Sequence, residues 1–302
     1  MHFLIELCKM INKLTQKIAF ILFKLNLFVR RNYLLRKLLY TIGIESLFYK
    51  FIRYHVETTK EIYFEDDISG TKIKVIDGTP RHNYYHQALR GKRYEPAVVS
   101  MLKKLLIEAD SPTFVDIGAH IGYFTVYAGN LLGRRGSVIS IEPNRDYYRQ
   151  LLKNIEINCL QENTKTFQIA LSNKTCKAEM GGWEDRDLIE FERGKIDVMT
   201  FDQLCEIEGI KPDIIKIDVH GAEYKVLSGM TSTLDNHVKH LLLETHSEDV
   251  MQGYNIPDVI NFFDSTKFEL FKLNDFRLNM RVEIVPIDDY VHADTMLYIR
   301  RR

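Results

Sequence analysis

Short apolar runs alternate with helical patterns along most of the chain. The helical patterns cover residues 96–108, 146–158 and 222–230, and the strand patterns cover residues 113–117, 137–141, 167–172, 213–219, 239–246, 268–273 and 295–300. Strands that alternate with helices in this way are typical of a parallel sheet with helices packed against its faces. The pattern therefore predicts an α/β fold built on a mostly parallel sheet.

The turn after residues 113–117 has the composition of a nucleotide-binding turn. Asp116 lies at the end of the strand, and Gly118 and Gly122 precede an apolar helix. Glycines let a ligand approach the backbone, and the first N–H groups of a helix have no partner within the helix. Phe124 stands where the third glycine of a dinucleotide fingerprint would fall, and Asp116 would repel a pyrophosphate. A cationic ligand without phosphate, such as S-adenosylmethionine, suits this turn better. The alternative is an ordinary turn with a solvated acid.

A second acid follows the next strand. Glu142 comes directly after residues 137–141, and Pro143, which has no N–H, stops further strand pairing. In a right-handed βαβ unit the carboxyl ends of the two strands lie side by side. A carboxylate at this point can accept hydrogen bonds from both hydroxyls of a ribose. The alternative is a surface acid at a strand end.

Two charged residues interrupt the apolar run at residues 213–219. Lys216 and Asp218 lie on one face of the predicted strand, and charged side chains are rarely buried unless they are paired. One interpretation is a mutual ion pair, and the other is that Asp218 faces a reaction centre. Glu244 ends a later strand in the same way. Ligands of open α/β sheets bind where such carboxyl ends meet.

Seven short segments along the chain match one enzyme family in order. They are residues 94–96, 114–119, 141–144, 170–172, 200–204, 215–223 and 243–246. The region from Tyr94 to the C-terminus, about two thirds of the chain, resembles the FkbM-type methyltransferases. These are Rossmann-like enzymes that depend on S-adenosylmethionine. The resemblance implies a class I methyltransferase fold with a mostly parallel, seven-stranded sheet and helices on both faces. The chain departs from the family at His220, where the family often has Glu.

The resemblance also implies which residues form the site. Those expected to bind the cofactor S-adenosylmethionine are Glu95, Asp116, Gly118, Ala119, Gly122, Glu142, Pro143, Ala170 and Asp218. The segment before the first core strand would cover the cofactor, with Tyr94 and Glu95 lining this lid, although Glu95 could equally stabilise the start of its helix. The candidates for the catalytic base are Asp218, His220 and His246, with Glu244 behind them. A histidine suits this role because its ordinary pKa is near neutral.

The implied reaction is methyl transfer from S-adenosylmethionine to a hydroxyl of a sugar, glycolipid or secondary metabolite. One rival is an NAD-dependent oxidoreductase, and another is a non-catalytic, membrane-associated binding protein with the same fold. Whether a divalent metal takes part stays open, because some O-methyltransferases hold Mg²⁺ between acids. No residue spacing here is typical of a metal site, so no metal ligands are assigned. Nucleic acid is not an expected partner, because the basic residues lie in the N-terminal region and not around the predicted pocket. A polar segment, residues 173–193, would border the pocket. It contains Trp183, which could stack on a sugar but could equally pack locally.

The first 55 residues differ from the rest in charge and periodicity. They carry ten Lys or Arg and two Glu, although the whole chain has a formal net charge of zero. Apolar residues recur there every three or four positions, with lysines on the opposite face, which predicts an amphipathic helix. It would lie in the plane of an anionic membrane surface, or it would pack on its own domain or on a partner subunit. We therefore expect three regions: a helical extension (residues 1–55), linking strands or a lid segment (residues 56–93) and the methyltransferase domain (residues 94–302).

Length and composition indicate the expected domain size and the expected cellular location. With 302 residues and 45% apolar content, the chain is long enough for one α/β domain with extensions. Four cysteines show no zinc-type spacing, which favours reduced thiols. No apolar run is long enough to span a membrane or to serve as a signal peptide. We expect a cytoplasmic protein that could contact the inner face of a membrane through residues 1–55. The sequence does not predict its oligomeric state.

Overall fold

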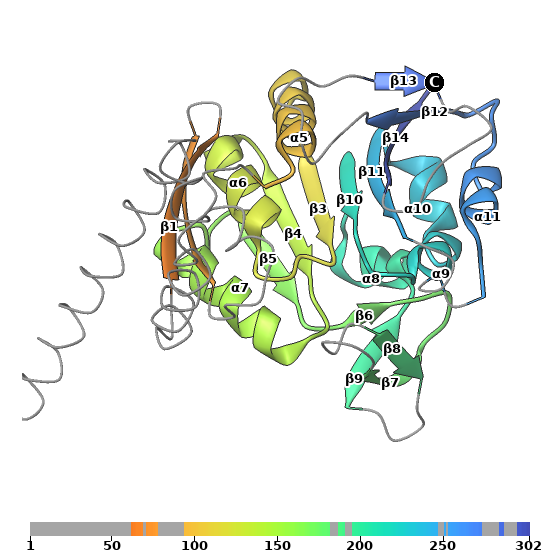
Figure 1. Cartoon of the computed structure of the whole chain (residues 1–302), viewed down its shortest axis with the longest axis horizontal. Helices are drawn as coiled ribbons and strands as arrows, with labels where there is room; N and C mark the ends of the chain where they lie inside the picture. Colours follow the sequence, from red (N-terminus) through yellow and green to blue (C-terminus); the bar gives the residue numbers. More distant parts are fainter. Residues whose placement is uncertain are drawn as a thin grey trace, which may run out of the picture. The chain divides into compact units, whose positions relative to one another are not determined.

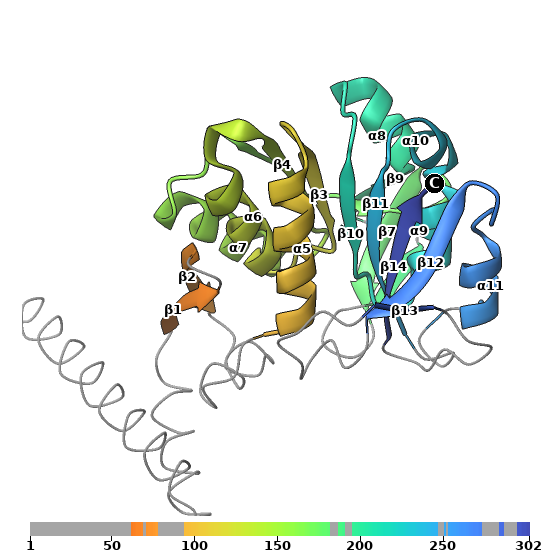
Figure 2. The same cartoon turned by 90° about the horizontal axis from the view of Figure 1, so that it is seen from above.

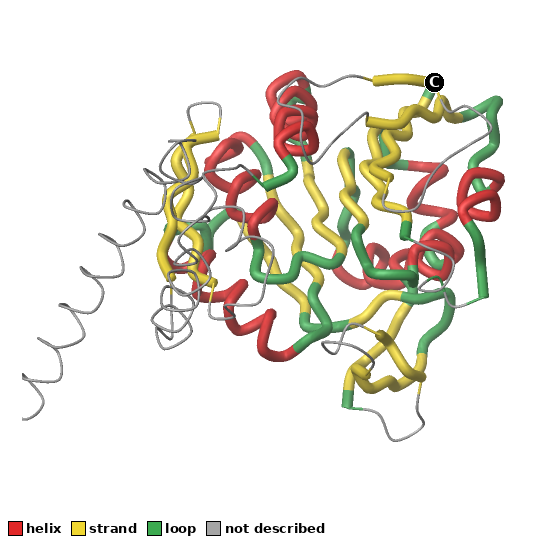
Figure 3. The backbone as a smooth tube through the Cα atoms, viewed as in Figure 1, coloured by secondary structure: helices red, strands yellow, loops and turns green. Residues whose placement is uncertain are grey.

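The computed structural model describes most of the chain beyond residue 93 (Figure 3). The described residues are 62–68, 71–77, 94–181, 187–190, 195–246, 251, 253–273, 284–286 and 295–302. Strands β1 (Ile62–Ile68) and β2 (Thr71–Asp77) form a two-stranded sheet within residues 56–93. The predicted helix of residues 1–55 and Trp183 lie outside the described residues. No helix of the described part has both the length and the apolarity that a membrane span requires.

The centre of the main unit is an eight-stranded sheet (Figure 1). The strand order is β13–β12–β14–β11–β10–β3–β4–β5. The bounds are β3 Thr113–Ile117, β4 Ser137–Ile141, β5 Thr164–Phe167, β10 Ile214–Ile217, β11 His240–Thr245, β12 Phe268–Leu273, β13 Ile284–Pro286 and β14 Thr295–Arg301. The strands from β11 to β5 run parallel, and β14, β12 and β13 pair antiparallel at the other edge. The predicted fold class is confirmed, with the three-residue β13 as an eighth strand that the prediction of seven did not include.

Helices cover both faces of this sheet (Figure 2). Helices α5 (Pro96–Glu108), α6 (Tyr123–Leu132) and α7 (Arg145–Ile157) pack on one face. The other face carries α8 (Phe201–Glu208), α9 (Glu223–Ser228), α10 (Thr231–Asn236) and α11 (Ile256–Asn261). Successive strand residues point to opposite faces. Val115 and Ile117 therefore join the core under α8–α11, whereas Asp116 points toward α6. This alternation determines which charged residues meet.

The prediction of one strand over residues 167–172 is wrong, because these residues belong to two strands. β5 ends at Phe167, and Ala170–Leu171 forms β6 in a separate four-stranded sheet of order β6–β9–β7–β8. Its other strands are β7 (Cys176–Gly181), β8 (Asp187–Glu190) and β9 (Ile196–Met199). Ala170, Ala178 and Val198 pack in a small separate core. Because β6 pairs with β9, residues 170–171 belong to this smaller sheet and not to the main one.

The turn between β3 and α6 depends on its two glycines. Gly118 and Gly122 have φ angles of 81° and 86°, a region that other residues rarely adopt. A Cβ atom on Gly118 would lie 1.8 Å from the carbonyl oxygen of Asp218, and one on Gly122 would lie 2.4 Å from Cδ1 of Leu151. The backbone conformation favours glycine at both positions, and at Gly118 a side chain would also meet a backbone carbonyl that cannot move aside. These reasons are separate from the approach of a ligand.

Gly118→Ala is expected to lower the free energy of unfolding by about 3 kcal/mol or more, because a left-handed backbone and a clash with a carbonyl oxygen add together. Urea denaturation followed by circular dichroism measures this loss. Gly209→Ala is the matched control, since Gly209 has a φ of 66° but no atom within 4 Å of the added Cβ. It should cost only about 1 kcal/mol. Equal losses in the two variants would show that the close approach to Asp218 is unimportant.

Candidate functional site

The acids predicted at the strand ends lie on neighbouring strands. In the sheet, Asp116 of β3 is in register with Ser140 of β4 and with Lys216 of β10. Glu142 and Asp218 directly follow β4 and β10, and Glu244 is the penultimate residue of β11. Asp116 and Asp218 both raise the pKa of Glu142, so the carboxylates are within electrostatic reach of one another. The structure therefore brings the predicted acids together at the carboxyl edge of the sheet.

Glu142 is held by the backbone of two turns. Its Oε2 accepts a hydrogen bond from the N–H of His120, and its Oε1 accepts one from the N–H of Asn144, each at 2.8 Å. Burial raises the pKa of Glu142 to about 7, although the two backbone hydrogen bonds act in the opposite direction. A carboxylate oxygen has two lone pairs. Each oxygen of Glu142 therefore keeps one acceptor position in addition to its backbone partner.

Asp116 lies below helix α6. Its Oδ2 accepts a hydrogen bond of 2.7 Å from the hydroxyl of Thr125, which also contacts the hydroxyl of Ser140. Its Oδ1 is buried, with no hydrogen-bond donor among the described residues. Burial raises the pKa of Asp116, while Lys216 and Thr125 lower it. Side chains of neighbouring elements therefore surround Asp116, whereas backbone N–H groups hold Glu142.

Lys216 and Asp218 form the ion pair expected from their spacing. Nζ of Lys216 lies 3.2 Å from Oδ2 of Asp218 and 4.7 Å from the centre of the Phe124 ring. Burial alone lowers the pKa of Lys216, but Asp218 and Asp116 outweigh this effect and raise it. Burial alone raises the pKa of Asp218, but Lys216 and the neighbouring histidines hold it well below its usual range. Both groups are therefore charged.

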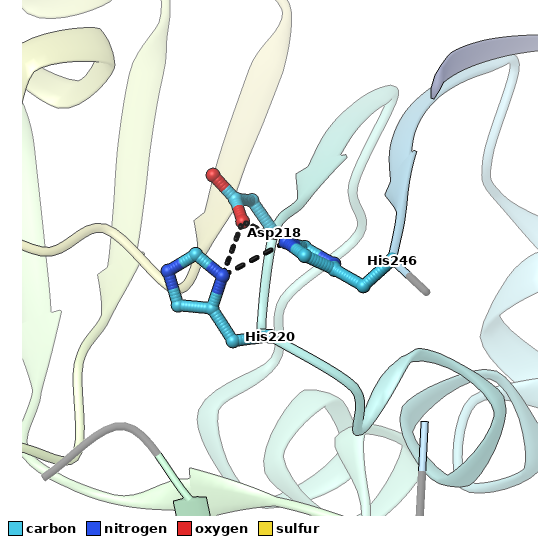
Figure 4. A group of neighbouring side chains, drawn as sticks. All are labelled: Asp218, His220 and His246. Carbon is cyan, nitrogen blue, oxygen red and sulfur yellow. Dashed lines mark hydrogen bonds and ion pairs between the residues drawn. The ribbon is translucent and has the colours of Figure 1, made fainter. Parts of the chain in front are cut away.

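Asp218 also meets the two predicted histidines, as Figure 4 shows. Nδ1 of His220 and Nε2 of His246 are 2.8 Å apart, and Oδ1 of Asp218 lies 3.8 Å from each of these nitrogens. His220 has a left-handed backbone with a φ of 48° and is 38% exposed, whereas His246 is buried. The three candidates for the catalytic base thus converge on one point.

Glu223, the first residue of α9, belongs to this site although the sequence pattern gave it no role. It is fully buried, and its Oε1 accepts hydrogen bonds from Nδ1 of His246 at 2.7 Å and from the N–H of Gly221 at 3.0 Å. Burial alone lowers the pKa of His246, but the hydrogen bond and charge of Glu223 outweigh it and raise the pKa to about 9. The only sequence signal for this role was the acid's position directly after the turn that carries His220.

The other predicted cofactor residues lie at varying distances from this centre. Ala119 is buried in the turn after β3, where its N–H donates to the carbonyl oxygen of Ile141. Pro143 is half-buried beside Glu142, whereas Ala170 belongs to the smaller sheet. Glu95 is buried and makes no side-chain capping bond to α5, but its charge raises the pKa of Lys216. Its carboxylate therefore interacts electrostatically with the central ion pair.

Negative charge is in excess in this part of the molecule. The six carboxylates at the site are those of Glu95, Asp116, Glu142, Asp218, Glu223 and Glu244, and all except the partly exposed Asp218 are buried. Lys216 is the buried lysine among them, and His246 adds a further positive charge when protonated. Buried charge is stable when it is paired. The arrangement therefore favours a cationic ligand.

Two kinds of group suit these residues. S-adenosylmethionine carries a sulfonium and an ammonium group, which match the acids in sign, and a ribose, whose hydroxyls match Glu142. Within the described ranges, one group of three His, Cys, Asp or Glu residues is arranged to hold a metal ion. It consists of Asp218, His220 and His246, whose ligand atoms lie within 4.8 Å of one another.

The sequence is similar to a methyltransferase family and to one curated methyltransferase. The family model of the methyltransferase FkbM domain matches residues 116–276. Hexuronic acid methyltransferase AglP from Haloferax volcanii is 26% identical over 229 residues, which cover 71% of this chain and 87% of that protein.

Two solved structures align with part of the backbone. Methyltransferase FkbM from Methylobacillus flagellatus aligns with a TM-score of 0.45 and 16% identity over 84% of this chain and 60% of that one. An O-methyltransferase from Bacillus cereus in complex with SAH aligns with a TM-score of 0.43 and 14% identity over 68% of this chain and 81% of that one. The chain thus spans 60% of the Methylobacillus protein and 87% of the Haloferax protein.

Proposed function

The chain belongs to the FkbM methyltransferase family, and from this premise we propose that it transfers a methyl group from S-adenosylmethionine to an oxygen of a sugar-containing acceptor. The observation that supports this most directly is the position of Glu142. Two backbone N–H groups hold its carboxylate at the end of β4, beside the turn that follows β3. In an open α/β sheet the ribose of a bound nucleotide lies at this point.

The charge of the site supports S-adenosylmethionine as the methyl donor. The buried carboxylates favour a cation, and S-adenosylmethionine brings a sulfonium without any phosphate. NAD would instead bring a pyrophosphate toward Asp116. Glu142 would accept the ribose hydroxyls, and the turn of Gly118, Ala119 and Gly122 would lie against the cofactor. Pro143 and Ala170 would border the adenosine.

A sugar acceptor is supported by the Haloferax relative, whose name gives a hexuronic acid as its substrate. In the proposed reaction the acceptor hydroxyl loses its proton, and its oxygen attacks the methyl carbon. A carbon–oxygen bond forms while the carbon–sulfur bond breaks, and the bonding electrons pass to sulfur. The products are the methylated acceptor and neutral S-adenosylhomocysteine.

The proton would pass to the group formed by Asp218, His220 and His246. His246 is a poor base at neutral pH, because a pKa of about 9 keeps it protonated. Asp218 is a weak base because its pKa is low. His220 is partly exposed, and its Nδ1 lies 3.8 Å from Oδ1 of Asp218 and 2.8 Å from Nε2 of His246. It is therefore assigned as the base, with His246 and Glu223 as positioning residues. A general base raises the reaction rate by about 10²–10⁴-fold, and alignment of donor and acceptor lowers the activation barrier by roughly 7–11 kcal/mol.

The test uses tritiated S-adenosylmethionine with the purified chain and a panel of hexuronic acids and neutral sugars. Transfer of label to a sugar supports the proposal, and resistance of the label to alkali distinguishes an ether from an ester. Calorimetry compares S-adenosylhomocysteine with NAD. Tight binding of NAD alone would favour the oxidoreductase. Binding of S-adenosylhomocysteine with no labelled product from any sugar or from a cell extract would favour a non-catalytic binding protein.

His220→Ala is expected to lower kcat by about 100-fold, because it removes the proposed base. The Kd for S-adenosylhomocysteine should stay within about twofold of wild type, because the assigned ribose contact is made by Glu142. Steady-state kinetics and calorimetry measure the two effects. His237→Ala, a histidine outside this group, should change neither. Loss of cofactor affinity in His220→Ala would show that the assignment of roles is wrong.

The affinity for S-adenosylhomocysteine is expected to rise with pH and to level off above about 7, where Glu142 is ionised. Below this pH the neutral carboxyl accepts ribose hydroxyls less well, so the Kd should increase by up to about tenfold per pH unit. The opposite trend is expected for the stability of the free protein. The stability that the neutral Glu142 contributes is fully present below its usual pKa of 4.5 and is lost as pH rises through 7. Calorimetry between pH 5.5 and 8 measures the affinity, and Glu142→Gln should remove its pH dependence. A flat profile for the wild type would contradict the assignment of Glu142.

A further inference from the structure

We propose that Asp218, His220 and His246 bind one divalent transition-metal ion. Its ligand atoms are Oδ1 of Asp218, Nδ1 of His220 and Nε2 of His246 (Figure 4). Two imidazoles and one carboxylate suit zinc, cobalt, iron or manganese, whereas magnesium and calcium prefer oxygen ligands alone. The binding of the ion is independent of the proposed methyl transfer, but the role that we give to the ion rests on it.

The distances are close to those of a coordination sphere. Nitrogens bound to a metal at about 2.1 Å lie roughly 3.0–3.4 Å apart when they are cis ligands. The two histidine nitrogens are 2.8 Å apart, and Oδ1 of Asp218 is 3.8 Å from each. The two rings stand at 79° to each other. Binding of the ion would displace the proton that the two histidine nitrogens share in their hydrogen bond. Movements of about half an ångström would complete the site.

Two of the three ligands are already oriented for this task. Nδ1 of His246 faces Oε1 of Glu223 at 2.7 Å, which directs Nε2 toward Asp218 and His220. Carboxylates that bind the second nitrogen of a metal-bound histidine orient the ring and raise its basicity. Oδ2 of Asp218 pairs with Lys216, while Oδ1 is buried with no hydrogen-bond donor among the described residues. An ion would supply the partner that this oxygen lacks.

The ion would act on the acceptor of the proposed reaction. Three protein ligands leave coordination positions open, and a metal-bound hydroxyl loses its proton more readily than a free one. With the ion present, His220 would be a ligand and the acceptor proton would pass to water. The carbon–oxygen bond then forms and the carbon–sulfur bond breaks as before. An acceptor with a carboxylate next to its hydroxyl, such as a uronic acid, could bind through both groups.

The experiment adds Co²⁺ to the full chain after treatment with EDTA, because Co²⁺ reports its ligands by visible absorption. We expect one ion per chain, with absorption bands of a nitrogen- and oxygen-ligated site. His220→Ala should weaken this binding by at least about 100-fold, and Glu223→Gln by about 10–100-fold. Because His220 is partly exposed, His220→Ala is expected to fold, and circular dichroism checks this. His237→Ala is the control and should bind like wild type.

The outcomes separate the metal site from the methyl transfer. Absence of Co²⁺ binding, or binding that His220→Ala leaves unchanged, overturns the metal site, whatever the result with tritiated donor. Binding of Co²⁺ by a chain that binds no S-adenosylhomocysteine supports the site and counts against the proposed function. Turnover that EDTA leaves unchanged, in a chain that binds Co²⁺ as expected, overturns the role of the ion. Turnover lost with EDTA and restored by Zn²⁺ or Co²⁺ supports it.

Discussion

Replacement of Glu142 by Ala is expected to weaken the binding of S-adenosylhomocysteine by about 10²–10⁴-fold. Two ribose hydroxyls would lose a charged acceptor, and each such hydrogen bond contributes roughly 1.5–3 kcal/mol. The carboxylate is well prepared for this role, because the N–H groups of His120 and Asn144 fix both of its oxygens. Isothermal titration calorimetry at pH 8, where Glu142 is ionised in the free protein, measures the loss.

Glu156→Ala is the matched control, because it removes an exposed acid from the helix that follows Glu142. Its affinity should equal that of wild type. Loss of the carboxylate leaves the N–H groups of His120 and Asn144 without their acceptor. Thermal unfolding therefore checks that Glu142→Ala remains folded. If a folded Glu142→Ala bound S-adenosylhomocysteine within about threefold of wild type, the ribose would lie elsewhere.

Much of the fold could be predicted because local pattern and tertiary role agree. The bounds of α5 match the prediction, and β3 and β4 each lie within one residue of the apolar run that predicted them, since a glycine or an acid ends each run. β5 and β6 could not be separated in the same way. Ala170 and Leu171 look like a continuation of a strand, and only their pairing with β9, nearly thirty residues later, removes them from the main sheet.

The site could be predicted where strand geometry alone determines it. Parallel strands place their carboxyl ends together, so the convergence of Asp116, Glu142 and Asp218 follows from the strand order. The contact between Glu223 and His246 does not follow, because it requires α9 to begin close to the end of β11. Nor does the contact between Gly118 and Asp218, which depends on the exact path of two turns. The first contact joins residues 23 apart, and the second joins residues 100 apart in turns whose φ angles no spacing shows.

Lys216→Met is expected to lower the free energy of unfolding by about 3–5 kcal/mol at neutral pH, since it removes one partner of a buried ion pair. Lys216 is 2% exposed and is the lysine that neutralises both Asp116 and Asp218. Without it, these carboxylates would be buried next to each other with no ammonium group between them. Urea denaturation at pH 7.5 measures the loss. Lys165→Met is the control, because Lys165 pairs with Glu208 at the surface, where a salt bridge contributes at most about 1 kcal/mol.

The loss in Lys216→Met should also depend on pH, and its direction identifies the cause. In the wild type the pKa of Asp218 is held below its usual value of 3.8. The stability from this effect is present above about pH 4 and is lost as the pH falls through the lowered pKa. Lys216→Met lacks this contribution, and its unpaired carboxylates take up protons as the pH falls. The difference between variant and wild type should therefore be largest near neutral pH and should shrink toward pH 4. A difference that stays constant from pH 7.5 to pH 4 would mean that Lys216 stabilises the core through the packing of its side chain on Phe124, and not through its charge.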